Sequence, residues 1–435
     1  MVKMKEKIHV KVKNNSQTIE RILRPITCIS WLLGVGIAHP RKCSKAITII
    51  IRMIHMAVCS YVMICDTQLF FIRISLMDEK GDIFMYIYSL NRMMCYISIF
   101  YYIYYGIRQY NKWPELMDRL NELDQKIKKE ISINDWPIKI IEALAIFTTF
   151  VFCSLWPTLQ FLHYYILSYT IPESIIIEML IYYFLAQSLI NSFVFDVVIY
   201  VLYRRFQTLN KVIGHLDKLS DVQWIAFKIR RIRELHADIC DLVSMLNDIH
   251  SLHLLFCSGH CFIMAIISLF NLILLIKHVK WLTLTNDFLY ILYSMQFYLI
   301  CWICTLACQE ANSTGKIIHK IILNCKPMNL GKHEASNQSS LEVRSSLEVS
   351  NSEQNSNWKS SHNPFVMENF LRRNLDLECV RKEVNDFSIQ LQQNRITFSA
   401  YDFFEINNAS YGCFVGVVVT YPIIIIQFIY TVNKW

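Results

Sequence analysis

Seven continuous apolar runs constrain most strongly what this chain can fold into. They lie at residues 46–72, 83–106, 140–165, 175–203, 254–276, 286–308 and 409–430. The hydrocarbon core of a bilayer is about 30 Å thick, so an α-helix that rises about 1.5 Å per residue crosses it in roughly 20 residues. Backbone amides inside lipid must bond within their own segment, which a helix achieves. We therefore predict an all-α, polytopic membrane protein with seven transmembrane helices.

The composition agrees with a membrane protein and argues against other classes. Of the 435 residues, 54% are hydrophobic and the mean hydropathy is +0.31, both high for a globular protein. The net charge of +8 is spread over the segments between apolar runs, which favours a topology signal over nucleic-acid binding. No catalytic constellation, phosphate-binding loop or convincing metal-ligand spacing occurs, so we expect neither an enzyme nor a cofactor. The cysteines lie mostly inside apolar runs, where they predict packing rather than disulfides.

The distribution of lysine and arginine sets the orientation. Their counts in successive segments, from the N-terminal one to the tail, are 10, 2, 7, 0, 8, 2, 11 and 1. High and low values alternate, and cytosolic connections carry the excess of basic residues. We predict a cytosolic N-terminus and an extracellular C-terminus, the reverse of a G-protein-coupled receptor. The four glycosylation sequons, at Asn14, Asn312, Asn337 and Asn408, fall on the predicted cytosolic side or its border, so we expect no N-glycan.

This topology divides the chain into five parts. They are a cytosolic N-terminal segment (1–45), spans one to six with cytosolic helical extensions (46–308), a cytosolic connection (309–408), the last span (409–430) and an extracellular tail (431–435). No removable signal peptide is expected in the first part. Within the long connection, a polar and nearly repetitive stretch at 331–363 predicts disorder, and 375–395 predicts a helix.

Three connections on the predicted cytosolic side have the apolar spacing of amphipathic helices. The stripes are Leu116, Leu120, Leu123 and Ile127, then Ile225, Ile229 and Ile232, and finally Val380, Val384, Phe387 and Leu391. We expect them to pack against one another below the membrane. A calmodulin target or a membrane-surface helix is the alternative.

The last apolar run differs from the others because one side of it is small and partly polar. At about 100° per residue, five positions fall within an arc of roughly 80° on a helix: Gly412, Gly416, Thr420, Ile423 and Gln427. Such a stripe suits either the close approach of a second helix or the lining of a water-filled path. The residues alone leave both readings open.

The same run ends in a recognisable pattern. Thr420, Tyr421, Gln427 and Phe428 reproduce the TYxxxxxQF signature near the C-terminus of the last helix, and the chain thereby resembles the insect gustatory receptor family. The preceding residues, 398–407, are similar to that family's approach to the helix. The chain departs from the family pattern at Asp402, where Gly is common, and at Asn407, where Asp is common. A third departure is Pro422, which removes a backbone donor.

The resemblance implies a ligand-gated, poorly selective cation channel in the plasma membrane of sensory neurons. Its partners would be a small-molecule tastant, permeant cations and membrane lipids, and it would form a homotetramer or a heteromer with related receptors. The last helix would line the pore through the stripe defined above, and Phe428 and the isoleucines would form a dewetting gate. The last span contains no acidic side chain, which argues for broad conduction.

A ligand pocket is implied in the outer half of the bundle formed by spans two to six. Candidate residues at that depth are Tyr86, Arg92, Gln160, His163, Tyr182, Tyr183, Gln187, Tyr290, Tyr293 and Gln296. Aromatic faces mixed with amides suit a sugar, and a bitter compound is the alternative ligand. Helix packing is the competing interpretation for each position. Arg92 and Asp66 lie at similar predicted depths, which predicts a structural ion pair first and a ligand contact second. A G-protein-coupled receptor and a transporter are less favoured functions.

Overall fold

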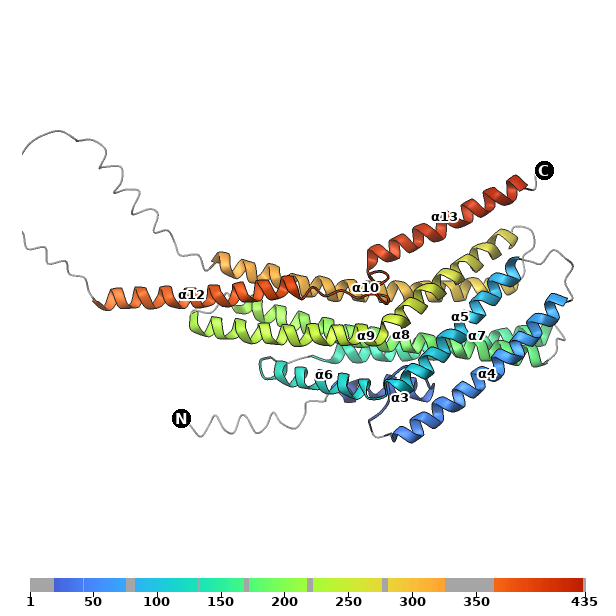
Figure 1. Cartoon of the computed structure of the whole chain (residues 1–435), viewed down its shortest axis with the longest axis horizontal. Helices are drawn as coiled ribbons and strands as arrows, with labels where there is room; N and C mark the ends of the chain where they lie inside the picture. The colour runs from blue at the N-terminus through green and yellow to red at the C-terminus, as the bar shows by residue number, and fades with distance from the viewer. Residues whose placement is uncertain are drawn as a thin grey trace, which may run out of the picture. The chain divides into compact units, whose positions relative to one another are not determined.

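A computed structural model describes residues 19–41, 43–75, 83–131, 134–167, 172–216, 222–275, 281–324 and 364–432. These residues are helical with short connections, and their only β-type pairing is an isolated bridge between Ser399 and Glu405. The helices, of which all but α2 are labelled in Figure 1, are α2 (Ile19–Ile22), α3 (Arg24–Leu32), α4 (Lys45–Ser75), α5 (Ile83–Arg108), α6 (Lys112–Lys128), α7 (Trp136–Leu167), α8 (Pro172–Leu216), α9 (Val222–Leu275), α10 (Trp281–Asn324), α12 (Pro364–Gln393) and α13 (Asn408–Val432). The predicted all-α class is confirmed.

Each predicted span falls on a long helix, but several helices are much longer than a span. The helices α8, α9 and α10 contain 45, 54 and 44 residues. Roughly 20 residues are enough to cross a bilayer, so each of these helices is about twice as long as a single span requires. Among the residues that the structure describes, four helices are long and apolar enough to span: Lys45–Ile72, Tyr183–Leu216, Gln223–Ser268 and Tyr290–Lys320.

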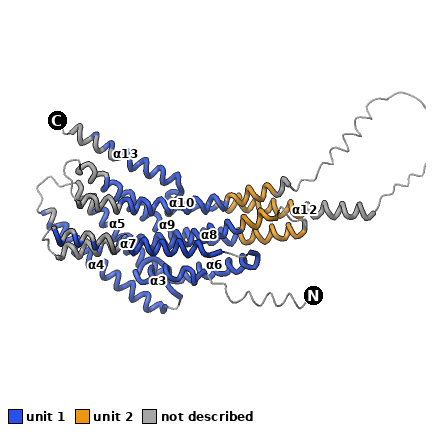
Figure 2. The backbone as a smooth tube through the Cα atoms, turned by 180° about the vertical axis from the view of Figure 1, so that it is seen from behind, with its two compact units in different colours: residues 1–208, 237–311, 396–435 blue, residues 209–236, 312–395 orange. Residues whose placement is uncertain are grey.

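The chain divides into two compact units, coloured separately in Figure 2. Unit 1 comprises Met1–Thr208, Ala237–Ala311 and Ile396–Trp435, and unit 2 comprises Leu209–His236 and Asn312–Arg395. Unit 1 therefore contains most of the apolar helical segments together with α13. The stretch at 331–363, for which we predicted disorder, lies outside the described residues.

In unit 1, the short helix α2 packs against α6, and α3 packs against α7. The predicted stripe of α6 is the packed face, because Leu116, Leu120, Leu123 and Ile127 are all at most 2% exposed. The buried carboxylate of Glu142, on α7, accepts a hydrogen bond of 3.1 Å from the backbone N–H of Ile26 on α3. This bond satisfies one of the free donors in the first turn of a helix.

A buried charge network in unit 1 joins α8 to α6. The guanidinium of Arg205 is fully buried, and it donates to both carboxylate oxygens of Asp124 at 2.7 and 3.0 Å. It also donates to Asp135, just before α7, at 2.9 Å. Burial raises the pKa of Asp124 above its usual value although the Arg205 charge acts in the opposite direction. The two groups therefore depend on each other, since either one alone would be an unpaired buried charge.

Unit 2 confirms that the other two predicted stripes are packing faces. Val380, Val384 and Phe387 on α12 are at most 2% exposed, and Ile225, Ile229 and Ile232 on α9 are also buried. The ring of Phe387 meets that of His236 at 5.5 Å. At the same contact, Gln390 donates to the backbone carbonyl of Arg233 at 3.2 Å.

Candidate functional site

A tight turn leads into the last helix. The backbone N–H of Phe403 donates to the carbonyl of Ala400 at 3.1 Å, and φ is +52° at Tyr401 and +59° at Asp402. Two central residues with positive φ define a type I′ turn. Two further backbone bonds, Ala400 N–H to Phe404 O at 2.9 Å and Ile406 N–H to Phe398 O at 2.8 Å, extend it into a short hairpin.

The turn geometry explains the first departure from the family pattern. Asp402 occupies the left-handed region, where glycine has no steric cost and Asp or Asn is tolerated better than other residues. Its carboxylate also accepts a hydrogen bond of 2.9 Å from the Ser399 hydroxyl. Glycine and aspartate are therefore two solutions to the same backbone requirement.

The left-handed backbone conformation of Asp402 leads to a prediction about the stability of two variants. We expect Asp402→Gly to change the free energy of unfolding by less than about 1 kcal/mol, because relief of left-handed strain offsets the lost hydrogen bond. Asp402→Val should cost about 1–3 kcal/mol, because a β-branched residue fits poorly at positive φ. Thermal unfolding of the purified variants measures both. Equal stability of the glycine and valine variants would contradict the assignment of the turn.

The turn is clamped to α9 by one amide side chain. The Oδ1 atom of Asn247 accepts from the backbone N–H of Ser399 at 2.9 Å, and its Nδ2 atom donates to the Ser399 hydroxyl at 3.3 Å. Asn247 is partly buried, so these bonds are shielded from water. Movement of α9 at this level must therefore move the start of α13 or break both bonds.

The side chain of Asn407, the second departure from the family pattern, caps the start of α13. The Oδ1 atom of Asn407 accepts from the backbone N–H of Ser410 at 2.9 Å, which is the bond of an N-cap residue. An aspartate at this position would accept the same bond. The next residue, Asn408, donates its N–H to the Thr305 hydroxyl on α10 at 2.9 Å. Two free donors of the first turn are thus satisfied before the helix enters the apolar run.

One face of α13 packs against helices of the same chain. The ring of Tyr411 lies 6.0 Å from Phe297 and 5.1 Å from Tyr298, and Phe414 lies 5.4 Å from Phe297. Further along the same face, Val418 is 5% exposed and Tyr421 meets Phe262 edge-on at 6.4 Å. This face holds α13 against α10 and α9.

The predicted stripe lies on the opposite face. The stripe and the packed face are centred about 180° apart at 100° per residue. A β-carbon added at Gly412 or Gly416 would meet no atom within 4 Å. Thr420, Ile423 and Gln427 are exposed, and the Thr420 hydroxyl donates to the Gly416 carbonyl at 2.7 Å. The backbone remains helical through Pro422, whose side chain, like that of Phe428, lies outside the described residues.

The predicted ligand residues are held by internal partners. Arg92 forms the predicted ion pair with Asp66, which also accepts from the Tyr96 hydroxyl at 3.1 Å. The other described candidates bond or pack as follows: Tyr183 OH with His55 Nδ1 at 3.1 Å, Gln187 Nε2 with Leu33 O at 2.6 Å, Gln296 Nε2 with Asp196 Oδ2 at 2.7 Å, Tyr293 stacked on His260 at 6.1 Å, and Tyr290 packed beside Tyr293. The side chains of Tyr86, Gln160, His163 and Tyr182 lie outside the described residues.

Only some of the predicted ligand-binding residues lie next to one another. Tyr290 and Tyr293 share one apolar cluster, whereas Gln187 and Gln296 bond to different segments. The histidines of α9 are also engaged internally, since His253 lies 2.8 Å from the Tyr102 hydroxyl and 3.1 Å from that of Ser192. Within the described ranges, no group of three metal-ligating side chains is placed to hold an ion.

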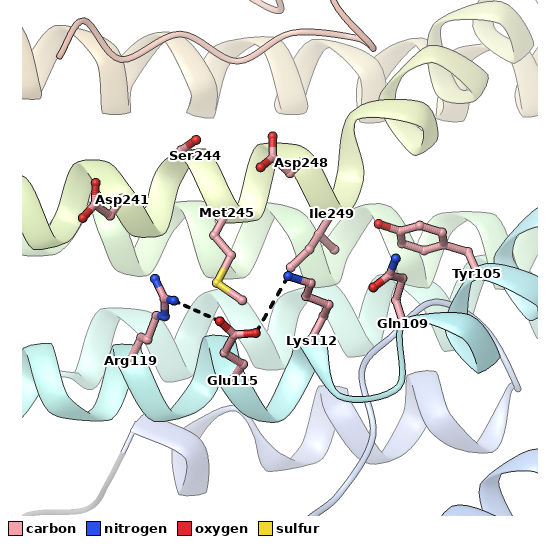
Figure 3. Close-up of a pocket in the computed structure, with 10 residues that line it drawn as sticks. All are labelled: Tyr105, Gln109, Lys112, Glu115, Arg119, Asp241, Ser244, Met245, Asp248 and Ile249. Atoms are coloured by element: carbon pink, nitrogen blue, oxygen red, sulfur yellow. Dashed lines mark hydrogen bonds and ion pairs between the residues drawn. The ribbon is translucent and has the colours of Figure 1, made fainter. Parts of the chain in front are cut away.

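A separate cavity lies between the end of α5, α6 and α9 (Figure 3). Its volume is about 450 Å³, and it is lined by Tyr105, Gln109, Lys112, Glu115, Arg119, Asp241, Ser244, Met245, Asp248 and Ile249. We call it the α6–α9 cavity. The sequence did not reveal it, because all its residues except Tyr105, at the end of the second predicted span, come from two predicted cytosolic connections that are far apart in the chain and that each have the pattern of a solvated helix face.

The comparisons with known proteins agree with the fold. The insect olfactory receptor OR5 from Machilis hrabei superposes with a TM-score of 0.59 at 14% identity, covering 97% of this chain and 99% of that one. The same receptor in complex with eugenol gives a TM-score of 0.56 at 15% identity, covering 94% and 97%. At these identities the likeness is one of fold.

The sequence itself assigns the family. No curated protein matches the chain significantly. Residues 23–330 and 347–432, most of the chain, match the description 7tm chemosensory receptor. The chain therefore belongs to the 7tm chemosensory receptor family.

Proposed function

We propose that this chemosensory receptor is a tastant-gated, poorly selective cation channel of the gustatory type. In this proposal four copies assemble around an axis, and the stripe of α13 lines the ion path. The observation that carries it is the stripe of α13, which is small and partly polar, is exposed in the single chain and lies opposite the face that packs on α9 and α10.

The chemistry of the stripe suits a hydrated monovalent cation. Thr420 and Gln427 would offer hydroxyl and amide dipoles, and the two glycines would leave the path wide. The described part of α13 contains no charged side chain, so selectivity would come from dipoles and from charges at the mouths. The alternative, a packing face of small residues, predicts tight helix contacts without conduction.

Ligand binding belongs to the same proposal. The receptor OR5 has been captured with eugenol, a small molecule, within the same fold. We propose that a small-molecule tastant, a sugar or alternatively a bitter compound, binds in the outer half of the bundle. The clamp between Asn247 and Ser399 would transmit the movement of α9 to the start of α13.

Whole-cell recording from cells that express this chain alone tests the proposed function. A panel of sugars and bitter compounds should evoke a cation current that persists when G-protein signalling is blocked. The compound class that evokes the current decides between the sugar and the bitter receptor. Responses that require second messengers would overturn the channel and favour a G-protein-coupled receptor.

The position of Gln427 leads to a specific prediction. Gln427→Ala should change the single-channel conductance or the relative permeability of Na⁺ and K⁺, because an amide dipole is removed from the path. Recordings from excised patches measure both quantities. Val418→Ala, on the packed face, serves as the control and should leave permeation unchanged. Identical permeation in the Gln427→Ala channel would exclude this residue from the pore.

A further inference from the structure

Three buried histidines, His250, His253 and His260, form a row along one face of α9. At about 100° per residue they fall within an arc of roughly 80°, and ten residues of helix place the ends of the row about 15 Å apart. All three side chains are at most 3% exposed. Neither the proposed ion path nor the clamp at Asn247 uses them. Buried polar groups need partners, so the contacts of each ring indicate what the row connects.

The end of the row nearer the predicted extracellular side contacts a predicted ligand-binding residue. The ring of His260 stacks on that of Tyr293 from α10 at a centroid distance of 6.1 Å, and its Nε2 atom lies 3.2 Å from Sγ of Cys95 on α5. Tyr293 and Cys95 belong to one apolar cluster with Leu185 of α8. Rings at this distance are in packing contact. A compound that displaces Tyr293 must therefore also displace His260.

The middle of the row joins three helices at one point. The Nδ1 atom of His253 lies 2.8 Å from the Tyr102 hydroxyl on α5, and its Nε2 atom lies 3.1 Å from the Ser192 hydroxyl on α8. A neutral imidazole has one donor and one acceptor, and a hydroxyl can be either, so both bonds form at once. Tyr102 and Ser192 are each 1% exposed. Loss of the imidazole would leave both hydroxyls without this partner in a site that excludes water.

The other end of the row reaches the hairpin that precedes α13. The ring of His250 lies 5.1 Å from that of Phe195 on α8, and Phe195 meets Phe398 edge-on at 6.2 Å. Phe195 is fully buried, and Phe398, at the start of the hairpin, is 1% exposed. The next residue, Ser399, is the one that Asn247 clamps. The hairpin is therefore held to α9 by a packed aromatic contact as well as by hydrogen bonds.

We propose that this histidine row couples the predicted ligand pocket to the hairpin at the start of α13. A shift of Tyr293 moves His260, the bond pair of His253 holds α5 and α8 to the moving helix, and His250 passes the shift through Phe195 to the hairpin. Packed interiors have discrete arrangements, so a shift at one end is taken up at the other. The inference rests on the proposed function for its consequence, the opening of a path along α13.

Hydrogen exchange of the purified full-length receptor, followed by mass spectrometry, tests the row without any ligand. Loss of one buried contact should make residues 398–406 exchange about 5-fold faster in His250→Leu, and also in His260→Leu, although His260 lies 13 residues beyond Asn247 on α9. His236→Leu is the matched control. It removes another buried histidine of α9, 11 residues before Asn247, that packs on Phe387, and it should leave the exchange of 398–406 unchanged. A response to His250→Leu alone, or an equal response to His236→Leu, would overturn the coupling.

Whole-cell current evoked by sucrose and by quinine, one compound from each class of the panel, gives the second readout. His253→Leu should lower the maximal current per surface receptor about 5-fold and change the half-maximal concentration less than about 3-fold, because the pocket is kept and the link is lost. His253→Gln should keep most of the current, since an amide also has a donor and an acceptor. A raised half-maximal concentration at unchanged maximal current would place His253 in the pocket and overturn the coupling. If no compound of the panel evokes a current in the unmodified receptor, the proposed function fails, and the exchange experiment still decides the coupling.

Discussion

Replacing Arg205 with methionine is expected to destabilise the receptor by about 3–5 kcal/mol, the largest effect of any single substitution proposed for this chain. The side chain is fully buried and holds Asp124 from α6 and Asp135 from the start of α7. Methionine fills similar space but leaves the buried Asp124 carboxylate without its cation. The purified variant should unfold at a lower temperature and reach the cell surface in smaller amounts.

Two comparisons identify the cause of that loss. Arg204→Met removes the neighbouring arginine, whose guanidinium is only partly buried and bonds Gln207 at 2.8 Å, and it should cost less than about 1 kcal/mol. Adding Asp124→Leu to Arg205→Met should recover part of the stability, because the unpaired carboxylate is gone. A double variant less stable than the single one would contradict an electrostatic origin.

The destabilisation should also depend on pH. Burial raises the pKa of Asp124, and removal of Arg205 removes the main influence that lowers it. A carboxyl whose folded-state pKa is raised binds its proton more tightly in the folded protein, so its stability contribution is lost as pH rises above the unfolded value of about 4. The deficit of Arg205→Met should therefore be smaller near pH 4.5 than at pH 7.5. A deficit that grows on acidification would contradict this account.

In the proposed tetrameric channel, replacing Gly416 with leucine is expected to reduce ligand-evoked current at least about 10-fold without damaging the fold, because four leucines would narrow and dry the proposed path. An added side chain at Gly416 meets no atom of its own subunit within 4 Å, and leucine favours a helix more than glycine does. Thermal stability and surface expression should therefore be unchanged or slightly improved. Whole-cell current, normalised to surface expression, measures the loss.

The control for Gly416→Leu is the same substitution at Gly214. That glycine is exposed on α8 and also has no atom within 4 Å of an added β-carbon, so Gly214→Leu should leave the current unchanged. The size of the assembly distinguishes a stripe that lines the pore from a stripe that packs against another helix. A non-conducting variant that keeps the assembly size of the unmodified receptor supports pore lining, whereas dissociation into smaller species would support a packing face instead.

Helices whose apolar residues repeat at one clear spacing could be predicted from the sequence. The described residues of the seven apolar runs are helical, and the stripes of α6, α9 and α12 are buried as expected, except that Leu391 of the α12 stripe is only partly buried. Helix extents could not be predicted. The structure continues α9 without a break from the amphipathic stripe at Ile225 into the apolar run at 254–276, because neither pattern contains a residue that ends a helix. The N-terminal helices α2 and α3 were missed because neither reaches the length at which periodicity is readable.

The candidate site could be predicted where it depends on one helix and not where it depends on contacts between segments. The stripe of α13 follows from the spacing of five residues, and its open face agrees with that spacing. Arg205 lies at the end of an apolar run, where a basic residue is already explained by topology, so its two buried acidic partners gave no signal. The turn at Tyr401 and Asp402 lacks the glycine that would have indicated positive φ.

Accessibility of cysteines placed along α13 tests most directly whether its open face lines the ion path. In a background with the exposed Cys413 changed to serine, Thr420→Cys and Gly416→Cys channels would be treated with a charged methanethiosulfonate reagent during ligand application. We expect the reagent to block the current of both channels and to leave a Val418→Cys channel, whose cysteine lies on the packed face, conducting. Block at Val418 with no effect at Thr420 and Gly416 would contradict it.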